Sequence, residues 1–335
     1  MNKTLHALAL GLALLAGAGT AWGATPPPAD TTTIRIGGHD VPVVKGGLYD
    51  RFRSNPPLSV IATEAPDVDL SWFRGLEKQK VDMGFESWSP NFYYRNSRVT
   101  AIYTADLARL RELMPEGVLE EVQPLQVWPG RGLVALTAYA YEYCDNDSYN
   151  EIGLSVVTTR PGARGWGPFS LAAQSRANDF WGHVLKMPVD TELARVRGVV
   201  GYNLPKWLTK INYRDDGDTV VVEIFDSETG KLDVTMQTRA LDVSSSKESL
   251  IRNSFTNVDH DGRPTTGYSV SRQLRHASTS SSDTVELTLT DGSFSRFIES
   301  LDLGRMVRYE YVPDFQAALY APELLAPAAS AQSAP

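Results

Sequence analysis

Lys206 stands in a strongly apolar stretch. The segment RGVVGYNLPKWLTKINYR, residues 197 to 214, surrounds it with Val, Tyr, Leu and Trp side chains, and Pro205 stiffens the backbone directly before it. A lysine amine attacks a carbonyl carbon only when neutral, and in water its pKa of about 10.4 keeps it protonated at pH 7. Apolar burial lowers that pKa, as an imine-forming lysine requires.

A structural role fits the same stretch. The stem of a lysine can cover apolar surface while its ammonium group stays in water. The neighbouring Lys210 is expected at the surface in either case. The residues around Lys206 therefore leave a nucleophilic amine and a solvated one both open.

Other chemistries find little support. The five histidines form no metal-binding pair, and the acidic runs at 145–151 and 259–262 do not fit a complete calcium loop, so they are interpreted as turns. The chain also lacks a nucleophile elbow and a nucleotide-binding fingerprint. Cys144 is the single cysteine, expected to be a small buried side chain. We predict no metal and no cofactor.

Alternating apolar and polar residues dominate the middle of the chain, which is typical of strands. A helix is predicted over 106–114, with Asp106 as its N-cap, and a weaker one over 71–79. A hairpin loop is predicted at 226–231. So many strands with so few helices indicate a mainly β fold, a barrel or a sandwich. The predicted strands are 132–143, 152–159, 219–225, 231–241, 268–274, 284–290 and 306–312.

The ends of the chain differ from its middle. Residues 1–24 have the short basic start, apolar run and small residues of a secretory signal peptide, which predicts an exported protein, periplasmic or secreted. Residues 25–33 are predicted to be a linker and 321–335 a disordered tail. A formal net charge of −8 without a basic tract argues against a nucleic-acid partner. No later run is apolar enough for a membrane span.

Four segments in order resemble a known family. They are AIYTADLARLRELMPEG at 101–117, SYNEIGLSVV at 148–157, GVVGYNLPKWLTKI at 198–211 and LTLTDGSFSRFIESLDLGRMVRYEYVPDF at 287–315. Together they resemble the strand–helix segment, the Tyr-x-Glu segment, the Pro-Lys segment and the closing strands of acetoacetate decarboxylases. Order and spacing agree over roughly residues 90 to 315.

The resemblance implies one cone-shaped antiparallel β-barrel over 34–320, with few peripheral helices, an internal pocket and a homo-oligomeric assembly. It also implies a Schiff-base-forming lyase acting on a small-molecule keto acid. Lys206 matches the family's imine-forming lysine, and Glu151 matches its pocket glutamate. Arg98, or otherwise Arg95, matches the pocket arginine that would pair with Glu151 or hold a substrate carboxylate.

Two departures separate this chain from the family pattern. Trp207 stands where family decarboxylases carry a second lysine, and Thr137 stands where a further pocket glutamate is expected. These changes put acetoacetate itself in doubt more than imine chemistry, because relatives perform aldol or dehydration reactions through the same lysine. Tyr202, Leu204 and Trp207 are expected to dry and shape the pocket.

A non-catalytic function is the alternative. The same barrel, exported, could bind a small apolar or aromatic ligand. Aromatic side chains such as Trp88, Phe92, Tyr93 and Tyr94 could line its cavity, although core packing explains them equally well. The two hypotheses differ in where Lys206 points: inward, near Glu151 and an arginine, for the enzyme, and to solvent for a structural lysine.

Overall fold

The computed structural model describes residues 30–163 and 167–325. Residues from Thr31 onward form a compact unit of their own. The predicted signal peptide, most of the predicted linker and the end of the predicted tail lie outside the described residues. The first strand begins at Thr31, inside the range predicted as linker, and the last strand pair includes Glu323, inside the predicted tail.

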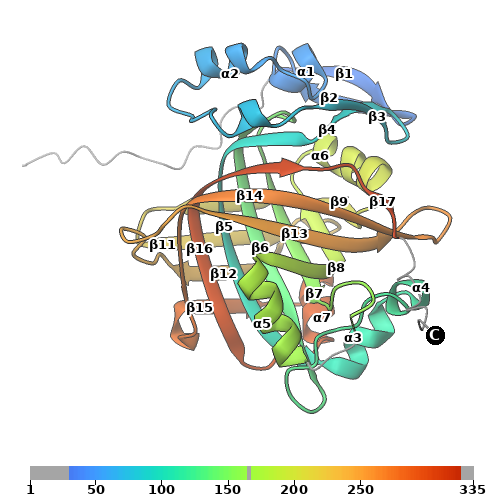
Figure 1. Cartoon of the computed structure of the whole chain (residues 1–335), viewed down its shortest axis with the longest axis vertical. Coiled ribbons are helices and arrows are strands. Elements are labelled where there is room, and N and C mark those ends of the chain that lie inside the picture. The colour runs from blue at the N-terminus through green and yellow to red at the C-terminus, as the bar shows by residue number, and fades with distance from the viewer. Residues whose placement is uncertain (1–29, 164–166, 326–335) are drawn as a thin grey trace, which may run out of the picture. The chain divides into compact units, whose positions relative to one another are not determined.

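Seven strands close into a barrel in the order β13, β14, β16, β5, β6, β7 and β8 (Figure 1). Six of the seven pairings are antiparallel, as expected, and the seam between β8 and β13 that closes the barrel is parallel. The barrel strands are β5 (Asn91–Asp106), β6 (Arg131–Cys144), β7 (Tyr149–Val157), β8 (Asp179–Val189), β13 (Ser249–Val258), β14 (Pro264–Thr279) and β16 (Met306–Leu319).

A second sheet covers the outer face of part of the barrel. It runs β10 (Ile211–Asp215), β11 (Thr219–Phe225), β12 (Leu232–Arg239) and β15 (Val285–Leu289), and the helix α7 (Ser293–Glu299) packs with it. Apolar side chains of both sheets form the main core, and α3 (Leu107–Leu113) and α4 (Glu116–Leu119) add to it.

Strand alternation sends polar residues into the barrel and apolar residues out to this core. On β5, Val99 and Ala101 are fully buried in the core between the sheets, whereas Arg98, Thr100 and Ile102 line the barrel interior. Successive side chains of a strand point to opposite faces, so one strand serves both layers. The interior is therefore the face on which a polar site can form.

The N-terminal elements form a smaller layer around a separate aromatic core. Phe73, Phe92 and Tyr94 meet there with ring centroids 4.9 to 6.2 Å apart. The elements are β1 (Thr31–Ile36), β2 (His39–Val44), α1 (Leu48–Phe52), α2 (Leu58–Glu64), the 3₁₀ turn η1 (Phe73–Gly75), β3 (Gln79–Asp82) and β4 (Glu86–Ser89).

Six further elements complete the described fold. Within residues 30–163 and 167–325, no helix combines the length and apolar character that crossing a membrane requires. The elements are α5 (Gly167–Ala177), α6 (Glu192–Val196), the 3₁₀ turn η3 (Ser282–Thr284) and two short strands, β9 (Lys206–Leu208) and β17 (Glu323–Leu324). One π-helical turn, η2 (Arg197–Gly201), follows α6 directly.

The predicted fold class, mainly β with few peripheral helices, is confirmed. All seven predicted strands exist, and 219–225 has the predicted bounds. Asp106 caps α3 as predicted, because its carboxylate accepts a hydrogen bond from the Arg109 backbone N–H at 2.7 Å. The helix predicted over 71–79 is wrong: only the turn η1 forms there, because Phe73 anchors it in the aromatic core.

Candidate active site

A cavity of about 440 Å³ lies inside the barrel. Paired strands place its lining residues in rows. Glu151, Tyr139 and Arg98 face one another across β7, β6 and β5. The next row along the strands holds Gly153, Thr137, Thr100 and Glu310, and the one after it holds Ser155, Ala135, Ile102 and Arg308. Ionisable side chains thus occupy three successive levels of the wall.

Lys206 points into this cavity and meets Glu151. Its Nζ lies 2.5 Å from Glu151 Oε2, and each side chain is only 7% exposed. Lysine and glutamate side chains are almost never buried this deeply unless they are paired. The lysine is therefore an inward-pointing group and not a solvated surface residue, whereas Lys210 is exposed as predicted.

The chain around Lys206 is built to admit its stem. The strand β9 pairs in parallel with β8, with Lys206 opposite Met187. Before it, the π-helical turn η2 ends in a loop whose Leu204 N–H donates to the Gly198 carbonyl at 3.0 Å. A Cβ atom on Gly198 would lie 2.2 Å from Lys206 Cδ, so any larger residue there would force the lysine stem to shift. π-Helical turns occur frequently at functional sites.

Tyrosines enclose the lysine–glutamate pair. Tyr141 donates its hydroxyl hydrogen to Glu151 Oε1 at 3.2 Å, and Lys206 Nζ lies 5.6 Å from the centre of the Tyr149 ring. The Tyr93 and Tyr149 hydroxyls are 3.0 Å apart. Burial, reinforced by the Glu151 charge, raises the pKa of Tyr141 well above its ordinary value. Tyr141 therefore stays protonated and serves as a hydrogen-bond donor to the carboxylate.

Arg98 belongs to a second charged group in the same wall. Its guanidinium donates to Thr100 Oγ1 at 3.0 Å and approaches Glu310 Oε2 at 3.5 Å, while Arg308 Nε donates to Glu310 Oε1 at 2.7 Å. Burial raises the pKa of Glu310, but the Arg98 and Arg308 charges outweigh it and hold the pKa below its ordinary value. Glu310 is therefore ionised, and this group carries one net positive charge.

Some of the residues expected at the site line the cavity, and the others lie outside its wall. Lys206, Glu151, Arg98, Thr137 and Leu204 all line the cavity. The Thr137 hydroxyl lies 3.1 Å from that of Thr100, so it joins the hydrogen bonds that hold Arg98 in place.

The other expected residues lie outside the cavity wall. Arg95 forms a half-exposed ion pair with Asp67, because it stands at an irregularity of strand β5. Trp207 packs edge-on against Phe294 of α7, because alternation along β9 turns it outward when Lys206 points inward. Tyr202 is buried beside Met83 and Leu204 without lining the cavity.

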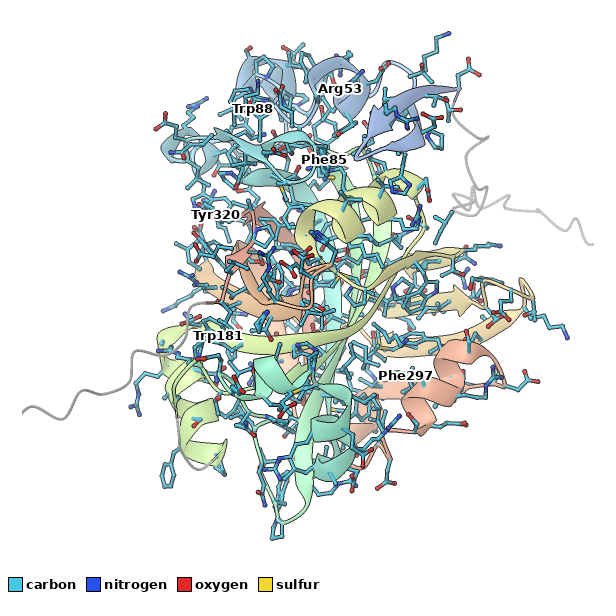
Figure 2. The ribbon with its side chains drawn as sticks, turned by 90° about the vertical axis from the view of Figure 1, so that its right-hand side faces the viewer. Arg53, Phe85, Trp88, Trp181, Phe297 and Tyr320 are labelled. Atoms are coloured by element: carbon cyan, nitrogen blue, oxygen red, sulfur yellow. The ribbon has the colours of Figure 1, made fainter. Side chains whose placement is uncertain are left out.

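Most of the aromatic side chains considered for ligand binding are packed elsewhere. Tyr93 lines the cavity, whereas Phe92 and Tyr94 belong to the N-terminal aromatic core. Figure 2 shows Trp88 with the N-terminal elements, away from Trp181 of the cavity wall. Core packing therefore explains Phe92 and Tyr94.

Sequence reasoning missed Glu310 and Arg308. The strand MVRYEYV carries them on alternate positions, opposite the buried Tyr309 and Tyr311. The sequence did contain a signal for them: this strand has two charged side chains on one face and two aromatic side chains on the other. No signal in the sequence indicated their closeness to Arg98, because that closeness depends on the long-range pairing of β16 with β5.

A possible metal-binding cluster among the described residues lies elsewhere, in the loop between β13 and β14. It comprises Asp259, His260 and Asp261. Arg263 pairs with both carboxylates, and Asp259 also accepts backbone hydrogen bonds from Asp261 and Arg263. These contacts are those of a tight polar turn, as expected for this stretch. The buried Cys144 is also as expected.

No protein-family model matches the chain, and neither does any curated protein. Solved structures do. An acetoacetate decarboxylase structure is 17% identical, covering 72% of this chain and 91% of that one with a TM-score of 0.49. Acetoacetate decarboxylase from Legionella pneumophila is 13% identical, covering 71% and 87% with a TM-score of 0.48. The enduracididine biosynthesis enzyme MppR complexed with pyruvate is 15% identical, covering 71% and 91% with a TM-score of 0.49.

The chain resembles acetoacetate decarboxylases and related enzymes. At these identities the likeness concerns the fold. The roles of Lys206 and Glu151 have to be argued from the contacts of this chain.

Proposed function

We propose that this protein is a lyase that forms a Schiff base between Lys206 and a keto acid. The observation that carries the proposal is the contact of Lys206 Nζ with Glu151 Oε2 at 2.5 Å, in the wall of an internal cavity. A nucleophile within hydrogen-bond reach of a base, with the base oriented by a third group, is the arrangement that covalent catalysis requires. Tyr141 is that third group.

Glu151 would first act as the base. The Lys206 ammonium passes a proton to the Glu151 carboxylate, and the freed amine attacks the substrate's ketone carbon. Glu151 then gives the proton to the former ketone oxygen, which completes the carbinolamine. Loss of water from the carbinolamine leaves a protonated imine. A positioned acid–base group of this kind contributes roughly 10²- to 10⁴-fold in rate.

The protonated imine would then accept electrons. When the bond to the substrate carboxylate breaks, its electron pair moves toward the imine nitrogen, and carbon dioxide leaves an enamine behind. Protonation of the enamine carbon and addition of water release the product ketone and restore Lys206. The same enamine could instead attack an aldehyde, so an aldol-type reaction uses the same residues.

Arg98 would recruit the acid group of the substrate. Its side chain is 9% exposed, and the group that it forms with Glu310 and Arg308 has one net positive charge. Charge-assisted hydrogen bonds to a carboxylate are about twice as strong as neutral ones. Arg98 occupies the same row as Glu151, so the acid group and the ketone can be held at one level of the barrel.

Borohydride trapping tests the proposal. Wild-type protein, Lys206→Met and Lys210→Met are incubated with a panel of keto acids and sodium borohydride, then analysed by intact mass and peptide mapping. We expect a reduced adduct on Lys206 in the wild type and in Lys210→Met, an exposed lysine four residues away. Trapping that survives Lys206→Met unchanged would refute the lysine's role.

A ligand-binding barrel remains a second candidate, favoured by one contact. A lysine held as an ammonium by Glu151 is not a nucleophile until it loses a proton, and the cavity is large enough to bind a ligand without reaction. Under this alternative, ligand affinity survives Lys206→Met and no covalent adduct forms with any acid.

We also propose, from the sequence of residues 1–24, that the protein is exported. The test is N-terminal sequencing of the protein purified from the periplasmic or culture fraction of the cells that make it. Removal of these residues is expected, and an intact Met1 in the cytoplasm would contradict export. The homo-oligomer implied by the resemblance is a separate proposal, which light scattering of the mature chain tests.

A further inference from the structure

The cavity has two unlike walls. One carries the charged residues Arg98, Glu310 and Arg308, from strands β5 and β16. The other comes from β8, β13 and the helix α5, and its large side chains are apolar: Leu171, Phe180, Trp181, Val184, Ile251 and Phe255. Figure 2 shows Trp181 beside α5, where the backbone N–H of Trp181 donates to Gln174 Oε1 of that helix at 3.0 Å. A ligand filling the cavity meets charge on one side and hydrocarbon on the other.

The cavity is large for a small keto acid. Its volume of about 440 Å³ falls within the range of roughly 300–1,000 Å³ that is usual for pockets holding drug-sized ligands. A substrate that reaches only Lys206 and Arg98 leaves the apolar wall in contact with water. Covering apolar surface stabilises a complex by about 25 cal/mol per Å². The wall therefore favours a substrate with a large apolar part.

We propose that the substrate is a keto acid bearing a bulky aromatic or long alkyl substituent. This inference rests on the proposed function of Lys206. The ketone carbon lies at Lys206, the acid group turns toward the Arg98–Glu310–Arg308 side, and the substituent extends along the β8–β13 wall. Ser175 of α5 and Arg308 are the exposed members of the lining that mark where the cavity meets solvent. Arg308 can therefore attract an incoming carboxylate.

Small residues keep the length of the cavity open. Ala135 lies two rows beyond Glu151, on the interior face of β6. A larger side chain at this position projects into the cavity and not into the core between the sheets, since alternation sends Leu136 and Val134 to that core. Ala135→Leu thus shortens the space for a substituent without touching Lys206, Glu151 or Arg98.

A series of substrates of increasing length tests whether the cavity favours a large apolar substituent. The kcat/KM of decarboxylation is determined for 3-oxo acids of increasing alkyl length and for one ending in a phenyl group, with acetoacetate as the shortest member. We expect kcat/KM to rise about four-fold for each added CH₂ that is buried, until the cavity is filled. Ala135→Leu narrows the cavity at the level that the substituent passes, so we expect it to remove this preference for length while the Lys206 adduct with acetoacetate still forms. Ala173→Leu, which adds the same atoms on the exposed side of α5, keeps the wild-type series.

The outcomes separate the two proposals. A Lys206 adduct with acetoacetate, combined with equal or falling kcat/KM for longer acids, overturns the inference and leaves the lyase standing. A length preference that Ala135→Leu does not alter also overturns it, because the substituent then lies elsewhere. No adduct with any member of the series refutes the lyase itself, and the inference with it.

Discussion

Two lysine–carboxylate pairs of the same length are buried in the part of the chain that the structure describes, and they differ in what surrounds them. Lys206 and Glu151 meet at 2.5 Å, as do Lys78 and Asp145, and all four side chains are nearly inaccessible to solvent. One pair lines the cavity, whereas the other is enclosed by the N-terminal aromatic layer. Distance and burial alone therefore do not identify a catalytic lysine.

The hydrogen bonds around the two pairs make the difference. Lys78 also donates to the Ser54 carbonyl at 2.7 Å, and Asp145 accepts from the Phe92 N–H and the Tyr94 hydroxyl. Burial lowers the pKa of Lys78 and raises that of Asp145, and each partner opposes the shift of the other. With its groups so fully bonded, the Lys78 pair joins segments of the fold. The Lys206 pair faces open space that a substrate can enter.

Replacing each lysine by methionine separates the two roles and has the largest effect. Lys206→Met is expected to remove keto acid turnover entirely. It also leaves Glu151 without its cation, but Glu151 keeps the Tyr141 hydrogen bond and faces the cavity, so we expect a smaller loss of stability than for Lys78→Met. Lys78→Met leaves a buried carboxylate without its cation, which costs roughly 3–5 kcal/mol of unfolding free energy. Denaturant unfolding and turnover are measured on both. The comparison fails if Lys78→Met, assayed while folded, loses turnover as Lys206→Met does.

Replacing each carboxylate sharpens the comparison. Glu151→Gln keeps a hydrogen-bonding group beside Lys206 but cannot take its proton, so kcat should fall by roughly 10²- to 10⁴-fold. Asp145→Asn should weaken the fold and leave kcat of the folded protein unchanged. Single-turnover trapping shows whether imine formation is the slowed step. Equal kcat values for Glu151→Gln and the wild type would remove Glu151 from the mechanism.

The close approach of Gly198 to Lys206 gives a third test. A methyl group there would contact the lysine stem at 2.2 Å, so the amine must move. Displacement of a reacting group by about 1 Å can cost about 10²-fold in rate. We expect Gly198→Ala to lower kcat on that scale, whereas Gly75→Ala, where the added atom meets nothing within 4 Å, is neutral. Full activity of Gly198→Ala would show that the lysine stem is free to shift.

A buried histidine that belongs to neither pair makes the stability of the fold depend on pH. His183 lies at the parallel seam, with Nδ1 3.2 Å from Thr256 Oγ1, and burial lowers its pKa to about 4. In the unfolded chain this histidine takes up a proton near pH 6.5, whereas in the folded chain it takes one up only near pH 4. The free energy of unfolding therefore falls as the pH drops from 6.5 to 4. The loss amounts to about 3 kcal/mol.

Urea unfolding of the wild type and of His183→Leu, followed across this pH range, measures that contribution. Between pH 6.5 and pH 4 the wild type should lose this amount of unfolding free energy relative to His183→Leu. If the unfolding free energies of the two proteins changed with pH in parallel, His183 would be protonated in the folded state. Neither lysine pair is required for this dependence.

Much of the fold follows from local sequence, and the failures have clear causes. TVVVEIF alternates cleanly, and β11 forms with the predicted bounds. Alternation did not predict the sixteen-residue strand β5, and only the family resemblance of 101–117 implied a strand there. Val99 and Ala101 are buried on its outer face, and Arg98 and Thr100 are buried on its inner face. With both faces covered, polar residues no longer mark the solvent side.

The site was predictable as far as local signals reached. The apolar surroundings singled out Lys206, the family resemblance singled out Glu151, and the structure brings the two together. Trp207 was misplaced because a single step along β9 reverses the facing of a side chain. Glu310 stayed hidden because its neighbours on β5 are more than 200 residues away in sequence.

The most direct test of the lysine's role is peptide mapping of the wild-type protein after borohydride reduction in the presence of a 3-oxo acid. We predict one modified lysine, Lys206, whose added mass is that of the substrate less carbon dioxide and less the water lost on imine formation, plus two hydrogens from the reduction. Modification of Lys78, or of exposed lysines only, would contradict the account. An adduct on Lys206 that retains the carboxyl group would support imine formation and contradict decarboxylation.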